Sequence, residues 1–521
     1  MYERSTISRR DLLGNTAKGA VLLGTGAIFG SRTISTPQHK TLSGPRRGGT
    51  LRAGISAGSS ADTLEADNPI SFCDWARAFN LYNALVARDA SGQEQYELAE
   101  EITPNASATR WVIRVKPDIT FHNGKSLTAD DVIFTFRRIV KNSFEGASGL
   151  ALVDMNSLRT LDKYTVELTT HVPYSTFIDT MGDWYYFIVP VGYDPKTPVG
   201  TGPFKYKSFT PGVESIFQRN PDYYVTGLPY VDELIISDYA DDTARINALE
   251  SKAVDCIDQL PSAGIPSVRS VSGVKILKGG YLWNPITMRV DSPPFNDVRV
   301  RQAMRLIVNR PDIIKFSLDD FGLVGNDLFG RFDPAVYDTA LPQRHQDLKQ
   351  AKALLKAAGS SDLRISLYTG DVANGLVEGA TVFAQEASSI GVTVNIVDMT
   401  SSSFFGPTYL RRVFSQDTWA SGTPYFTQVS LSMLPNSPFN ETHWDDPHYT
   451  NLYRQANAEL NESRRRDIAW EMQKIEWESG GYIIYSYFDI VDAYQDNVHG
   501  LVPSEVGWSF GNYGFDKVWL S

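Results

Sequence analysis

One stretch of the chain, residues 111–142, constrains the fold most, because a strand pattern and a helix pattern follow each other closely in it. Trp111–Val115 alternates apolar and polar residues, as a half-buried strand does. Asn123-Gly124 is a strong turn pair, and Thr128 followed by Asp131 is typical of a capped helix start. The apolar residues that then recur at helical spacing are Val132, Phe136, Ile139 and Val140. This stretch therefore predicts a strand, a turn and a helix.

The polar residues of this stretch also fit a structural role. Asp130 and Asp131 would lie at the positive end of the helix dipole, and Arg137 and Arg138 lie toward its negative end. His122 immediately precedes the turn. We therefore predict no catalytic or metal cluster here.

The same two patterns recur along the rest of the chain. Tyr164–Thr169 alternates like a strand, and residues 300–307 and 468–475 have helical spacing. Strands and helices that mix in this way indicate an α/β or α+β class. Because 521 residues exceed what one core usually organises, we expect two or three packed units.

Charge and cysteine content narrow the class of function. The net charge of −11 argues against a nucleic-acid partner, because phosphate binding requires a concentrated basic surface. No apolar run reaches the roughly 18 residues of a membrane-spanning helix. The only two cysteines, Cys73 and Cys256, exclude a CxxC motif; they are either buried thiols or one disulfide.

The first 45 residues have the layout of an export signal and leader. Ser8-Arg9-Arg10 precedes a short apolar segment, Gly19–Phe29, which is too short to span a membrane. The paired arginines match the twin-arginine address, although Leu12 replaces its usual phenylalanine. An ordinary secretory signal is the alternative. No cysteine stands directly after the apolar segment, so we expect an exported protein without a lipid anchor, in the periplasm or at the outer face of the cytoplasmic membrane.

Two short motifs suggest other chemistry. Gly54–Gly58 matches the G-x-S-x-G pattern of hydrolases, but the strands and oxyanion loop that should precede such an elbow are missing. His443 and His448 flank two carboxylates, but Pro447 prevents the helical spacing of a zinc motif, and a polar loop before a helix at about Tyr449 is predicted. We expect neither a catalytic site nor a metal site.

Five segments, taken in order, resemble the family 5 extracellular solute-binding proteins, which are the dipeptide, oligopeptide and nickel receptors of ABC importers. The segments are Gly48–Leu51, Trp111–Val132, Val199–Tyr224, Pro294–Ala303 and Asn497–Leu501. The resemblance covers essentially the whole chain after the leader.

This resemblance implies an α/β, two-lobed clam-shell of the periplasmic-binding-protein type II, large peptide-binding class. Lobe 1 would comprise residues 46–284, with an extra subdomain inserted at about 85–190, and lobe 2 residues 285–490. Residues 491–521 would return to lobe 1. A ligand would be captured by closure of the two lobes.

The resemblance also implies where the ligand lies. Relatives that bind peptides pair the α-amine with an aspartate, but Ala420 occupies that position here, and Thr423 replaces an acid often found before Pro424. Asp417 is a possible substitute. The residues that we expect to contact the ligand are Ser59, Ser60, Trp283, Asn284, Trp419, Ser421, Gly422, Tyr425 and Phe426.

The predicted function is substrate binding for an ABC transporter, with no enzymatic activity and no cofactor. The partners would be a peptide-like or neutral organic solute and the permease subunits, and the protein would be a monomer. A receptor for a sugar, or for nickel or a metallophore, is the alternative, and an exported hydrolase is the third possibility.

Overall fold

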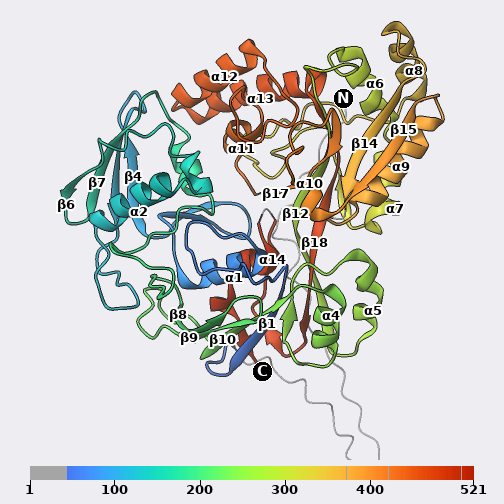
Figure 1. Ribbon diagram of the computed structural model, residues 1–521. Coiled ribbons are helices and arrows are strands. Elements are labelled where there is room, and N and C mark those ends of the chain that lie inside the picture. Colours follow the sequence, from blue (N-terminus) through green and yellow to red (C-terminus); the bar gives the residue numbers. More distant parts are fainter. Residues whose placement is uncertain (1–43, 371, 421, 506) are drawn as a thin grey trace, which may run out of the picture. The chain divides into compact units, whose positions relative to one another are not determined.

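A twelve-stranded mixed sheet organises the chain (Figure 1). The computed structural model describes residues 44–370, 372–420, 422–505 and 507–521. The strands of this sheet are β1 Thr50–Ser56, β8 Phe204–Thr210, β9 Glu214–Arg219, β10 Glu233–Tyr239, β11 Cys256–Ile257, β12 Val274–Met288, β13 Gly322–Val324, β14 Arg364–Gly370, β15 Thr393–Met399, β16 Phe414–Gln416, β17 Trp419–Ala420 and β18 Tyr482–Gln495. Their order is β15-β14-β16-β12-β18-β11-β1-β10-β9-β8, while β13 pairs with β18 and β17 with β12.

The two longest strands, β12 and β18, lie side by side in the middle of this sheet (Figure 1). They are antiparallel, and their register runs from Val274 opposite Gln495 to Thr287 opposite Tyr482. Nearly every residue of β18 is buried, because its alternate side chains pack into cores on both faces of the sheet. The register shifts at residues 278–281 and again at 283–285, so the ladder is irregular in the middle of β12.

Most of the buried apolar residues between 85 and 188 form a core of their own. Its antiparallel sheet has the order β4-β5-β7-β6, with strands β4 Ala99–Pro104, β5 Arg110–Val115, β6 Arg159–Asp162 and β7 Thr165–Thr169. Helix α2, Ala129–Asn142, packs on β6 and β7 through its apolar face. The predicted strands at 111–115 and 164–169 and the helix after Thr128 are confirmed.

The remaining elements cover the sheets. The helices are α1 Phe72–Leu81, α3 Phe177–Met181, α4 Asp242–Glu250, α5 Ile265–Ser270, α6 Val298–Ile307, α7 Arg310–Leu318, α8 Leu348–Ala357, α9 Leu376–Ser388, α10 Ser401–Phe404, α11 Tyr425–Ser432, α12 Pro447–Ala458, α13 Glu462–Ser479 and α14 Ser509–Tyr513, with short 3-10 turns η1 Glu145–Ala147, η2 Ser262–Gly264 and η3 Phe515–Lys517. The short strands are β2 Val86–Arg88, β3 Glu94–Tyr96, β19 Val498–His499 and β20 Trp519–Leu520. Helices α6 and α13 confirm the predicted helical segments. Among the described residues, no helix is both long and apolar enough to cross a membrane.

The structure corrects the predicted start of one helix and decides between a disulfide and two free thiols. Helix α12 begins at Pro447 rather than at about Tyr449, because a proline in the first turn loses no intrahelical hydrogen bond and Asp446 caps the N-terminus. Both Cys73 and Cys256 are buried free thiols.

The polar residues around α2 have the structural roles predicted for them. His122 accepts a hydrogen bond from the Gly200 N–H at 3.2 Å and donates to the Gly202 carbonyl at 2.9 Å. Burial lowers the pKa of His122 to about 4, so this imidazole is neutral. Asp131 is fully buried and accepts from the N–H groups of Thr128 at 3.0 Å and Val191 at 2.9 Å.

Asp131→Ala should lower the free energy of unfolding by about 2–4 kcal/mol, because it removes a fully buried carboxyl group and leaves two partly buried N–H groups without an acceptor. Its exposed neighbour is the matched control: Asp130→Ala should cost under about 1 kcal/mol, since it removes only a charge at the helix start. Urea unfolding of both variants measures the difference. Equal losses would contradict the role given to Asp131.

Candidate functional site

A cavity of about 430 Å³ lies among segments that are far apart in the sequence. This volume is in the range of sites for small molecules. Its walls come from residues 144–149 around η1, residues 183–186, Trp508, residues 405–409, β17 with its flanking residues, α11 and the 438–439 turn. Nine of the twenty lining residues are aromatic, and we call this space the aromatic cavity.

One wall is a cluster of tryptophans. Trp508 precedes α14 and stacks on Trp75 of α1 with ring centroids 5.3 Å apart, and it meets Trp184 edge-on at 5.0 Å. Tyr185 packs edge-on against Trp75 at 5.2 Å. Trp184, Tyr185 and Trp508 line the cavity, while Trp75 supports them from behind. These contacts hold three large rings in fixed positions.

The opposite wall is built on β17. Trp419 stacks on Trp283 of β12 at 5.9 Å and meets Phe439 edge-on at the same distance. Its indole N–H donates to Glu441 at 3.0 Å. Because β17 pairs with β12 with Trp419 opposite Trp283, the strand register sets the position of this ring.

Two buried carboxyl groups lie behind Trp419. Asp417 lines the cavity and accepts hydrogen bonds from the Tyr409 hydroxyl and the Thr418 N–H at 2.7 and 2.8 Å. Glu441 is also buried, and burial together with the neighbouring Asp417 carboxylate raises the pKa of Glu441 well above its usual value. Glu441 therefore holds its proton more tightly than a solvent-exposed glutamate does.

The predicted aromatic residues lie in two different environments. Trp419 lines the aromatic cavity. Trp283, Tyr425 and Phe426 are buried in the core that β12, α11, α12 and α13 share, and none of the three lines that cavity. Tyr425 donates to Glu476 at 2.6 Å. Trp283 contributes indirectly, because Trp419 stacks on it.

The predicted polar contacts are spread over the fold. Asn284 is buried and donates to the Asn374 carbonyl at 3.0 Å, and Gly422 is buried next to the cavity residues Ala420 and Thr423. Ser59 and Ser60 are exposed at the end of β1, outside the cavity. Ser421 lies outside the described residues.

The residues that suggested catalysis or metal binding do not converge. The Ser56 hydroxyl donates to Asp258 at 3.1 Å instead of meeting a histidine. His443 contacts Asp291 at 3.1 Å and the Leu410 carbonyl at 2.9 Å, whereas His448 contacts Glu471 at 3.1 Å. Each imidazole thus has partners of its own, and neither lines the aromatic cavity.

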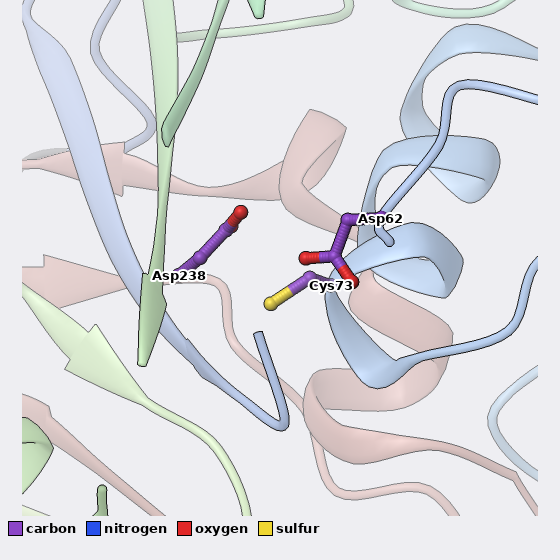
Figure 2. Close-up of side chains that lie close together, drawn as sticks. All are labelled: Asp62, Cys73 and Asp238. Carbon is purple, nitrogen blue, oxygen red and sulfur yellow. The ribbon is translucent and has the colours of Figure 1, made fainter. Parts of the chain in front are cut away.

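A second group of possible ligands, Asp62, Cys73 and Asp238, is an ion-pair cluster (Figure 2). The buried guanidinium of Arg77 pairs with Asp238 and lies 3.5 Å from Asp62. Burial raises the pKa of the Cys73 thiol far above its usual value, and this thiol contacts the Ile55 and Ser56 carbonyls. Arginine therefore already supplies the positive charge that a metal ion would bring.

Comparison with known proteins identifies the family. Residues 94–444, more than half of the chain, match the family described as bacterial extracellular solute-binding proteins, family 5 Middle. The chain belongs to this family. A di/tripeptide-binding protein 2 of Pseudomonas aeruginosa is 24% identical over 472 residues, which cover 82% of this chain and 87% of that protein.

Solved structures of such proteins have the same fold. DppA of Helicobacter pylori, in complex with the peptide STSA, matches with a TM-score of 0.76 at 20% identity, over 91% of this chain and 98% of that one. AgaA of A. tumefaciens R10, in complex with agropinic acid, matches with a TM-score of 0.77 at 22% identity, over 91% and 99%. The two-lobed α/β fold predicted for this member of the family is confirmed.

Sequence reasoning missed most of the cavity walls. Trp184 lies in the inserted segment and Trp508 near the end of the chain, and no spacing connects them. Glu441 lies beside His443, which drew attention to metal binding instead of to the carboxyl group. Of the cavity residues, Asp417, Trp419, Ala420 and Thr423 belong to the segment singled out beforehand.

Glu441→Gln should stabilise the protein increasingly as the pH rises above about 4.5, the usual pKa of a glutamate. Because the folded pKa of Glu441 is raised, the wild type loses stability as the pH climbs from this value toward the folded pKa. Glutamine mimics the protonated side chain and avoids that loss. Urea unfolding between pH 4 and 8 measures the effect, with the exposed Glu250→Gln as control. If the free energies of unfolding of the Glu441 variant and of the wild type changed in parallel with pH across this range, the raised pKa of Glu441 would be contradicted.

Proposed function

We propose that this protein is the extracytoplasmic substrate-binding component of an ABC transporter, which captures a peptide-like or other small organic solute between its lobes and delivers it to a membrane permease. The observation that carries the proposal is the aromatic cavity, whose walls come from the inserted segment, from Trp508 and from residues 405–439. Family membership supports the same function.

The hinge that we propose is the irregular middle of β12 with the facing part of β18. Register shifts at 278–281 and 283–285 interrupt the ladder there, and Gly280 has a positive φ of 79°, which other residues adopt only with strain. Lobe 1 would be residues 46–284, with the inserted subdomain at about 85–190, and lobe 2 would be residues 285–490. The tail at 491–521 would return to lobe 1. Closure at this hinge would complete the cavity, and the ligand must bind the closed state more tightly to favour it.

The chemistry of the walls favours an organic ligand. Rings can cover apolar groups or stack on planar ones, and Asp417 offers a carboxylate close to the place where relatives of the peptide-binding type carry theirs. A peptide-like solute fits the named ligand of the Pseudomonas relative. We propose that the receptor acts as a monomer and is exported without a lipid anchor.

Trp419→Ala should weaken solute binding about 10-fold or more, because it removes a large ring from the cavity wall. The control is Trp470→Ala, which removes a partly exposed indole from α13, outside the cavity. Native mass spectrometry of protein purified from its own host identifies the retained solute, and calorimetry with that solute compares the variants.

Two results would contradict the proposed function. One is a wild-type protein that carries no solute and captures none from a peptide hydrolysate. The other is equal affinity in the Trp419 and Trp470 variants.

We propose the twin-arginine route for export, with residues 1–45 as signal and leader, which lie almost wholly outside the described residues. Changing both Arg9 and Arg10 to Lys should leave the precursor in the cytoplasm, because that route requires the arginine pair. Immunoblots of cell fractions measure this. Normal export of the variant would instead indicate the ordinary secretory route, which needs only positive charge.

A further inference from the structure

The aromatic cavity has acidic side chains but no basic one among the described residues that line it. Its three carboxyl groups belong to Asp183, Asp417 and Glu145, which come from both walls. A peptide with free ends carries a carboxylate as well as an ammonium group. That carboxylate would find no lysine, arginine or histidine on the walls, and an unpaired buried charge costs several kcal/mol.

Among the described residues, the Asp417 carboxyl group forms no direct ion pair. Its hydrogen-bond partners Tyr409 and Thr418 contribute only neutral donors, and the neighbouring Glu441 is an acid whose pKa burial raises. Arg412 attracts Asp417 through space and lines a small second cavity with it, but it lies outside the aromatic cavity. Its guanidinium donates to the carbonyls of residues 403 and 404 and to the Thr408 hydroxyl. The Asp417 carboxylate therefore remains available to a positive group of the ligand.

The rings complete a site for a positively charged molecule. The nine aromatic side chains of the lining are Phe144, Trp184, Tyr185, Tyr186, Phe405, Tyr409, Trp419, Phe439 and Trp508. The faces of such rings attract cations, and tryptophan attracts them most strongly. The indole N–H groups of Trp184 and Trp508 have no hydrogen-bond partner among the described residues, so they can serve a carbonyl or hydroxyl oxygen of the ligand.

We propose that the aromatic cavity selects a solute of net positive charge: an amine with an aromatic or apolar body, whose ammonium group pairs with Asp417 and whose other end carries no carboxylate. This selectivity rests on the proposed solute-binding function and specifies its substrate class. Zwitterionic peptides with a free carboxyl end are then poor ligands.

Four forms of one dipeptide, Phe-Leu, separate the effect of the ammonium charge from that of the carboxylate charge. They are the amide, with net charge +1; the free dipeptide; the N-acetylated amide, which is neutral; and the N-acetylated acid. Competition native mass spectrometry of the full-length wild-type protein with an equimolar mixture should show the amide bound at least 10-fold over each other form. The same charge comparison is made on the peptides that the protein recovers from a casein hydrolysate.

Variants locate the source of the preference. Asp417→Asn should reduce the preference for the amide over the N-acetylated amide to under 3-fold, and Glu145→Gln should reduce it less, because Glu145 is exposed. Asp445→Asn, an exposed acid outside the cavity, should leave it unchanged. The wild-type charge preference needs no variant, so it decides the question even where Asp417→Asn fails to fold.

The outcomes are distinct. A free dipeptide bound as well as its amide, or recovery of mainly anionic or zwitterionic peptides, overturns the charge selectivity and leaves solute binding intact. A full preference that survives in folded Asp417→Asn overturns the role of Asp417. Capture of no solute from either source overturns the proposed function itself.

Discussion

The pairing of β12 with β18 is the interaction on which the rest of the structure depends. It lies in the middle of the main sheet, and the strands on its two sides belong to separate packed cores. The register of the pair also sets the position of the cavity wall. Trp283 of β12 lies opposite Tyr487 of β18 on one side and opposite Trp419 of β17 on the other. A slip of one residue would turn Trp419 away from the cavity. Ladder geometry and ligand geometry are therefore coupled.

Buried carboxyl groups in this fold are stabilised in two different ways. Around Asp62, Asp74 and Asp238, the guanidinium of Arg77 supplies the compensating charge, so the cluster is closed to other cations. Beside Trp419, burial and the neighbouring Asp417 raise the pKa of Glu441, and the described residues form no direct ion pair with Asp417. Asp417 lines the aromatic cavity. The difference separates a structural acid cluster from one that can take part in recognition.

Local elements of the fold could be predicted well from the sequence. The strand at Trp111, the turn at Gly124 and the helix capped by Asp131 depend on residues close together in the chain, where periodicity and capping chemistry act directly. The site could be predicted only in part. Trp419 lines the cavity, but Tyr425 and Phe426, a few positions on, lie in the core, because α11 turns them away from it.

The sequence by itself determined the α/β class, the capped helix of the inserted segment and the family, since each depends on local patterns or on an ordered set of motifs. Only the tertiary structure decided which aromatic rings meet. Trp184, Trp419 and Trp508 come from three distant segments, and long-range strand pairing and packing bring them to one cavity. It also decided that no basic side chain of the described part lines that cavity, because the direction of a side chain depends on partners that are distant in the sequence.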